Sequence, residues 1–109
     1  MAASAAVCLK IEDRAIAEGL SKAFVRGRME LVPVRRPVKV MIDYAHNAAA
    51  LESLLKAVRP LCKGRIICMF GCGGNRSGER RFQMGKVSGL LADLTVITSD
   101  NPRDEPPEN

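Results

Sequence analysis

Residues 65–98, RIICMFGCGGNRSGERRFQMGKVSGLLADLTVIT, hold two short apolar runs separated by a glycine-rich turn and a helical pattern. The runs at residues 65–70 and 94–98 have the length and apolar character of buried strands. Residues 79–92 between them predict an amphipathic helix. Its apolar face is expected to hold Phe82, Val87, Leu90 and Leu91. The order strand, helix, strand favours a parallel pair joined by a crossover helix.

The preceding segment extends the same alternation. Residues 38–42 form a continuous apolar run of the kind found in parallel sheets, and residues 29–34 predict a further strand. Asn47 is a plausible N-cap for a helix that ends at Pro60. We therefore expect an α/β fold, a Rossmann-like open and mostly parallel sheet with at least three parallel strands and flanking helices.

The N-terminal part has a different pattern. Residues 2–9 are small and apolar, and Asp13 is positioned to cap a second short helix. The periodicity changes from helical to strand-like after the basic turn at residues 25–28. We expect a domain boundary near Gly27, which divides the chain into residues 1–26 and 27–109.

Composition excludes several classes of protein. With 109 residues and 47% hydrophobic content, the chain suits one small core, and it has no apolar run long enough to span a bilayer. A cytoplasmic protein without membrane contact is expected. The 4 cysteines form no CxxC pair and there is 1 histidine, so no metal site or disulfide framework is predicted. The net charge of +5 favours anionic partners, but with 1 Tyr, 3 Phe and 0 Trp we expect no nucleic-acid binding.

Polar residues follow three of the predicted strands, at residues 43–46, 71–76 and 99–103. Ligands of open parallel sheets bind beyond the carboxyl ends of the strands. Asp43 is suited to accept hydrogen bonds from ribose hydroxyls, whereas the spacing of His46 alone favours a structural role. The glycine turn lets backbone N–H groups approach an anion, but it matches neither GxGxxG nor a P-loop. Both this turn and residues 99–103 are also compatible with ordinary surface turns.

Taken together, four ordered segments resemble the Mur ligase family, and within it the branch that adds the third residue of the peptidoglycan stem peptide. They are Gly27-Arg28-Met29-Glu30, Asp43-Tyr44-Ala45-His46, Phe70 to Arg76 (FGCGGNR) and Thr98 to Arg103 (TSDNPR). By the same resemblance, residues 1–26 correspond to the last helices of the central ATPase domain. Residues 27–109 correspond to the C-terminal domain, incomplete at its C-terminal end.

The resemblance implies an ATP-dependent amide ligase. ATP would phosphorylate the carboxylate of UDP-N-acetylmuramoyl-dipeptide to an acyl phosphate, which the amine of the incoming amino acid attacks. Residues carried over as ATP contacts are Arg28, Asp43 and His46, and those carried over as amino-acid contacts are Arg76, Asn101 and Arg103. Magnesium is expected as a cofactor, with ligands outside this chain.

The incoming amino acid is expected to be meso-diaminopimelate. It differs from lysine by a second carboxylate, which the guanidinium of Arg103 can bind bidentately next to the stiffening Pro102. Lysine would instead bring an ammonium group toward this arginine. The acidic residues Asp104 and Glu105 lie close in sequence and weaken this reading.

The chain departs from the family at Asn47-Ala48 and has no GxxxxGK[ST] loop. We therefore expect it to be inactive alone, to need the ATPase and UDP-binding domains as partners, and to self-associate through uncovered apolar surface. The alternatives are a cyanophycin- or folylpolyglutamate-type ligase domain and a non-catalytic module that binds a nucleotide or an amino acid.

Overall fold

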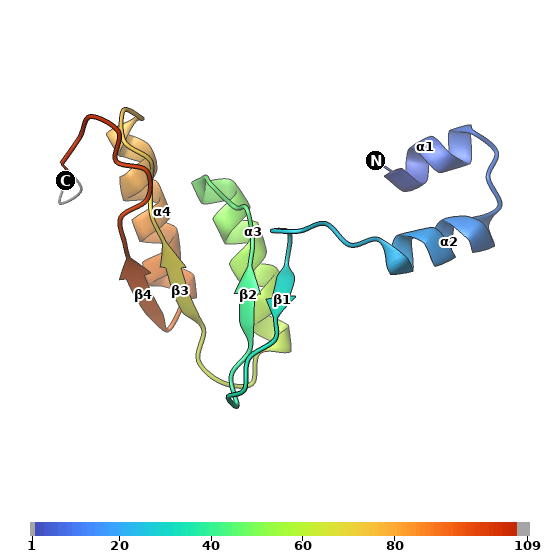
Figure 1. Cartoon of the computed structure of the whole chain (residues 1–109), viewed down its shortest axis with the longest axis horizontal. Coiled ribbons are helices and arrows are strands. Elements are labelled where there is room, and N and C mark those ends of the chain that lie inside the picture. The colour runs from blue at the N-terminus through green and yellow to red at the C-terminus, as the bar shows by residue number, and fades with distance from the viewer. Residues whose placement is uncertain (1, 107–109) are drawn as a thin grey trace. The chain divides into compact units, whose positions relative to one another are not determined.

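The computed structural model describes residues 2–106. The chain divides into two compact units, Met1–Tyr44 and Ala45–Asn109. Helices and strands alternate within the second unit, as the sequence pattern predicts (Figure 1). No helix within residues 2–106 is long and apolar enough to cross a membrane.

The first unit contains helices α1 (Ala2–Cys8) and α2 (Asp13–Lys22), followed by strands β1 (Glu30–Val32) and β2 (Val40–Ile42). The two strands pair antiparallel. The short connection at residues 33–39 explains this antiparallel pairing, since parallel neighbours need a crossover of about a dozen residues or more. Residues 38–42 were predicted to run parallel to the later strands, but among residues 2–106 β2 has no parallel partner.

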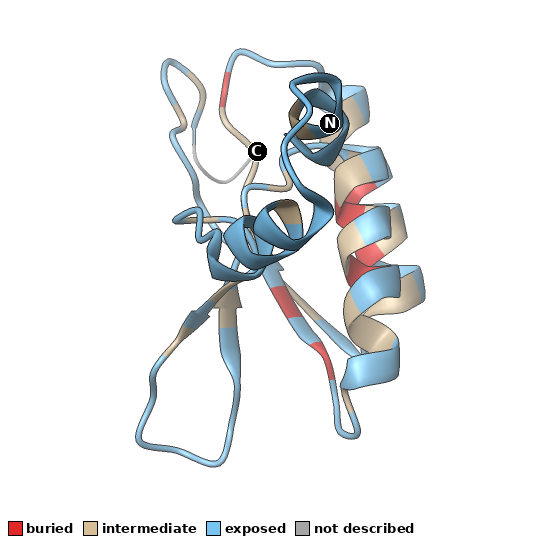
Figure 2. Ribbon diagram, turned by 90° about the vertical axis from the view of Figure 1, so that its right-hand side faces the viewer, coloured by how far each residue is buried: buried red, intermediate tan, exposed pale blue. Residues whose placement is uncertain are grey.

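The start of α2 also differs from the expectation. Glu12 occupies the N-cap position without a side-chain cap, and Asp13 is the first helical residue. A carboxylate in the first turn is stabilised by the helix dipole, so Asp13 favours this helix without capping it. None of residues 2–44 is buried (Figure 2).

The second unit is built from α3 (Ala48–Val58), the 3₁₀ turn η1 (Arg59–Leu61), β3 (Ile67–Phe70), α4 (Gly78–Leu91) and β4 (Leu94–Ile97). Strands β3 and β4 pair in parallel, which confirms the predicted crossover unit and the α/β class. Among residues 2–106 they form the only parallel pair, so the expected three parallel strands are not found. Asn47 caps α3 as predicted, because its Oδ1 accepts a hydrogen bond of 2.9 Å from the backbone N–H of Ala50.

The core of the second unit lies between α3, α4 and β3. Its buried apolar side chains are Leu51, Leu55, Ile66, Cys68 and Met84. These residues account for most of the buried positions in Figure 2.

Helix α4 presents only part of the predicted face to this core, since Val87 and Leu91 pack against it. Met84 and Ser88 are buried, whereas Phe82 and Leu90 are 75% and 73% exposed. Ser88 is accommodated because its hydroxyl lies 2.8 Å from the Thr95 hydroxyl on β4. A small residue and a shared hydrogen bond let the helix approach the strand closely, which apolar periodicity alone does not reveal.

Candidate functional site

The glycine loop (residues 71–77) follows the carboxyl end of β3 and lies against the segment that follows β4. A Cβ added to Gly74 would lie 1.8 Å from the carbonyl oxygen of Pro102. One added to Gly71 would lie 2.6 Å from the carbonyl oxygen of Thr98. These two glycines are therefore required by the close approach of two backbones.

The second segment, which we call the proline loop (residues 99–105), is hydrogen bonded to the glycine loop. The backbone N–H of Gly74 donates to the Asn101 carbonyl at 2.8 Å. In return, Nη1 of Arg103 donates to the Gly74 carbonyl at 3.2 Å. The structure thus brings Asn101 and Arg103 against the loop that carries Arg76. All three side chains are exposed.

Acidic residues of the proline loop make further contacts with the glycine loop and with α4. The backbone N–H of Asn75 donates to Glu105 Oε1 at 2.6 Å, and Asn75 Nδ2 donates to Asp104 Oδ2 at 2.8 Å. Glu105 also forms an ion pair with Arg81 of α4. The hydrogen bond from Arg81, followed by that from the Asn75 backbone, holds the pKa of Glu105 below its usual range. The carboxylates of Asp104 and Glu105 are therefore bound by Asn75 and Arg81, and neither is paired with Arg103 in these contacts.

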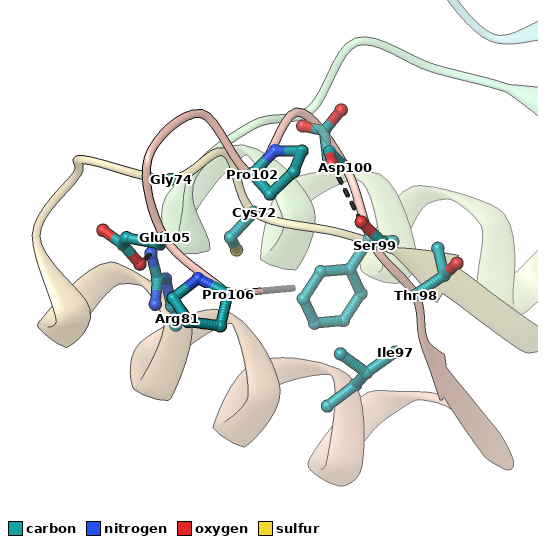
Figure 3. A pocket seen from close by; sticks show the side chains of 11 residues that line it. Cys72, Gly74, Arg81, Ile97, Thr98, Ser99, Asp100, Pro102, Glu105 and Pro106 are labelled. Carbon is teal, nitrogen blue, oxygen red and sulfur yellow. Dashed lines mark hydrogen bonds and ion pairs between the residues drawn. The ribbon is translucent and has the colours of Figure 1, made fainter. Parts of the chain in front are cut away.

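A cleft of about 480 Å³ lies beside these loops (Figure 3). Phe70, Ile97 and Pro106 supply apolar walls, and Arg81 and Glu105 lie together at one side. The three predicted amino-acid contacts do not line this cleft. Arg81 and Glu105 were not among the predicted site residues. Their opposite charges were visible in the sequence, but their pairing depends on the fold.

Two of the predicted ATP contacts belong to the first unit. The guanidinium of Arg28 lies 4.8 Å from the ring centre of Tyr44. The backbone N–H of Met29 donates to Asp43 Oδ2 at 2.9 Å. Gly27 and Met29 both have positive φ, 70° and 46°. The half-buried Asp43 thus holds the tight turn on which Arg28 is carried.

His46, the third predicted ATP contact, belongs to the second unit. Its backbone carbonyl accepts a hydrogen bond of 3.3 Å from Nη1 of Arg80 on α4. This contact ties the segment before α3 to the N-terminal half of α4. The imidazole itself is exposed.

An α/β unit with polar loops at the carboxyl ends of its parallel strands defines a class of ligand-binding domain. Residues 27–109 match the family model described as "Mur ligase, glutamate ligase domain". The chain belongs to the Mur ligase family.

The relatives of this chain carry a more specific name than the family does. The chain is 50% identical over 109 residues to a protein of Gloeobacter violaceus, covering 98% of this chain and 22% of the relative. It is 55% identical over 86 residues to a protein of Synechocystis sp., covering 77% of this chain and 17% of that relative. Both relatives are named UDP-N-acetylmuramoyl-L-alanyl-D-glutamate–2,6-diaminopimelate ligase.

A solved structure of a ligase with the same name is similar to this chain with a TM-score of 0.70 and 31% identity. The match covers 98% of this chain and 22% of that structure. The chain thus spans less than a quarter of the length of these relatives.

Proposed function

We propose that this chain is the amino-acid-binding part of an ATP-dependent ligase. The ligase would add meso-diaminopimelate to UDP-N-acetylmuramoyl-dipeptide during peptidoglycan synthesis. The observation that carries the proposal is the hydrogen-bonded contact of the glycine and proline loops, which gathers Arg76, Asn101 and Arg103 at one edge of the β3–β4 pair. The names of the relatives support the same substrate.

The proposed role of Arg103 is to bind the distal carboxylate of diaminopimelate. Its Nη1 donates a hydrogen bond to the Gly74 carbonyl, and this bond orients the guanidinium. The other N–H groups of the guanidinium are left to bind a ligand. Asp104 and Glu105 are engaged by Asn75 and Arg81, so they do not neutralise this arginine by direct pairing. Arg76 and Asn101 would hold the remaining polar groups of the amino acid.

Arg28, Asp43 and His46 are proposed as ATP contacts, with Arg28 near the phosphates and Asp43 near the ribose or a phosphate. ATP would activate the dipeptide carboxylate as an acyl phosphate. Charge stabilisation and positioning are the main contributions that side chains make to such transfers. Magnesium would accompany ATP, and its ligands are proposed to lie outside this chain. The ATPase and UDP-binding domains remain the proposed partners, and the cytoplasm the proposed location.

The competing ligases differ in the amino acid that they add. A cyanophycin- or folylpolyglutamate-type domain is disfavoured, because the relatives described above are diaminopimelate ligases. A non-catalytic binding module would share the same loops. It is distinguished by whether residues 27–109 support amide formation when joined to the rest of a ligase.

The amino-acid assignment is tested by titrating the ¹⁵N-labelled chain with meso-diaminopimelate and with lysine. We expect diaminopimelate to shift the backbone amide signals of residues 73–76, Asn101 and Arg103 and to bind more tightly than lysine. Arg103→Ala should weaken its binding by about 1–3 kcal/mol, the range for a charge-assisted hydrogen bond, with little effect on lysine. Equal affinity for both amino acids in the unaltered chain would refute the assignment.

A further inference from the structure

Asn75 of the glycine loop makes two hydrogen bonds to the proline loop. Its backbone N–H reaches Glu105 and its side-chain amide reaches Asp104. It also has a φ of 55°, in the left-handed region that asparagine adopts more readily than most non-glycine residues. The two acidic residues of the proline loop therefore fix the backbone immediately before Arg76.

Glu105 extends this contact to a third element. One carboxylate oxygen accepts from Asn75 and the other from Arg81 on α4. Among residues 2–106, Glu105 is the only hydrogen-bond acceptor of Arg81, whose buried Nε has none. The side chains of both partners are less than a third exposed, at 28% and 29%, so the pair is partly shielded from solvent and salt. We call these three residues, Asn75, Arg81 and Glu105, the clasp.

The clasp influences the position of the Arg103 side chain through the backbone of the glycine loop. Arg103 has a φ of 53° and donates to the Gly74 carbonyl, which belongs to the residue before Asn75. A shift of Asn75 would move this carbonyl and release the guanidinium. The backbone N–H of Glu105 also donates to the Pro102 carbonyl at 3.1 Å, which closes the turn around Arg103.

We propose that Glu105 is a positioning residue that acts through Asn75 and Arg81 to hold the Arg103 guanidinium in the direction of the distal carboxylate of the incoming amino acid. This inference rests on the proposed function. It predicts that the clasp sets selectivity for a dicarboxylic amino acid over lysine. Glu105 and Arg81 themselves need not touch the ligand.

The test compares the full chain with Glu105→Gln, Arg81→Met and the double variant. Glu79→Gln is the matched control, because Glu79 lies on α4 and bonds only to Gln83 among the described residues. For each protein we would measure the dissociation constants for meso-diaminopimelate and for lysine by NMR, the hydrogen exchange of the Asn75 amide, and the melting temperature. Glu105→Asp tests whether a shorter carboxylate restores part of the effect.

We expect Glu105→Gln and Arg81→Met to lower the ratio of the two affinities about tenfold, the loss typical of a charge-assisted contact. Lysine affinity should stay nearly constant, Asn75 exchange should accelerate, and the double variant should be no worse than either single one. Retained selectivity in Glu105→Gln would overturn the inference and leave the proposed function intact. Loss of both affinities together with a lower melting temperature would also overturn the inference, because it would indicate that Glu105 has only a structural role. An unaltered chain that binds neither amino acid would overturn the proposed function, and this inference with it.

Discussion

At the scale of single residues, the site contains two backbone conformations that are uncommon for residues other than glycine. Asn75 and Arg103 are non-glycine residues with positive φ, and each makes hydrogen bonds across the two loops. Such conformations persist where neighbouring contacts over-determine them, and they concentrate at functional sites. The sequence motifs identified Arg103 as a candidate. They did not reveal Asn75, because its role depends on the acidic residues that the fold places opposite it.

Gly74 permits the close approach of the two loops, and its substitution tests that contact. Gly74→Ala should lower the free energy of unfolding by about 2 kcal/mol or more, since its Cβ would lie 1.8 Å from the Pro102 carbonyl oxygen. Gly85→Ala is the control. Position 85 lies inside α4, and outside the adjoining backbone of the helix no atom lies within 4 Å of an added Cβ, so alanine should stabilise by about 0.5–1 kcal/mol. Urea unfolding of both variants measures the difference, and equal stabilities would contradict the close contact.

At the scale of elements, the sequence predicted the order of helices and strands because apolar runs and helical patterns are separated by polar, glycine or proline residues. It did not predict the partner of β2, which is decided by the short connection to β1. It predicted only part of the buried face of α4. Val87 and Leu91 pack against the core as expected, but Phe82 is exposed and Ser88 is buried. Burial there depends on how closely β4 approaches and on the hydrogen bond between Ser88 and Thr95.

The carboxylate of Asp93 links the start of β4 to the start of β3 and to η1. Its Oδ2 accepts from the Ile66 backbone N–H before β3 and from Arg59 of η1, each at 2.7 Å. The hydrogen bond from Ile66, followed by that from Arg59, lowers the pKa of Asp93. A lowered pKa in the folded state gives stability that is present above the unfolded pKa and lost as pH falls through the folded value.

We therefore predict that Asp93→Asn lowers the melting temperature at pH ~7 and that the difference from the unaltered chain shrinks progressively below about pH 4. Circular dichroism melting curves between these conditions provide the measurement. A difference that stays constant across the whole range would show that the charge of Asp93 does not contribute.

At the scale of the whole molecule, the β3–β4 pair leaves apolar side chains exposed on the face opposite its core. Ile67 pairs with Leu94 in register, and Met69 lies two residues further along β3 on the same face. Their exposures are 57%, 49% and 68% respectively. Parallel sheets are normally covered on both faces, so this face is expected to bind another apolar surface.

Self-association of the chain at high concentration is the expected result. Met69→Lys should reduce it, because a charge on the exposed face of β3 opposes close contact. Leu61→Lys introduces the same charge at a residue that is 74% exposed but outside the strands, and it serves as the control. Light scattering that finds the unaltered chain monomeric at high concentration, or equal effects of both lysines, would contradict this expectation.

The most direct measurement of the central claim uses a chimera. Residues 27–109 would replace the matching segment of the Gloeobacter violaceus ligase, a relative that is 50% identical to this chain. ADP release and amide formation would be followed with UDP-N-acetylmuramoyl-L-alanyl-D-glutamate and either meso-diaminopimelate or lysine. The account predicts amide formation with diaminopimelate, at least about tenfold less with lysine, and loss of this preference on Arg103→Ala. A folded chimera that forms no amide, or that uses both amino acids equally, would contradict it.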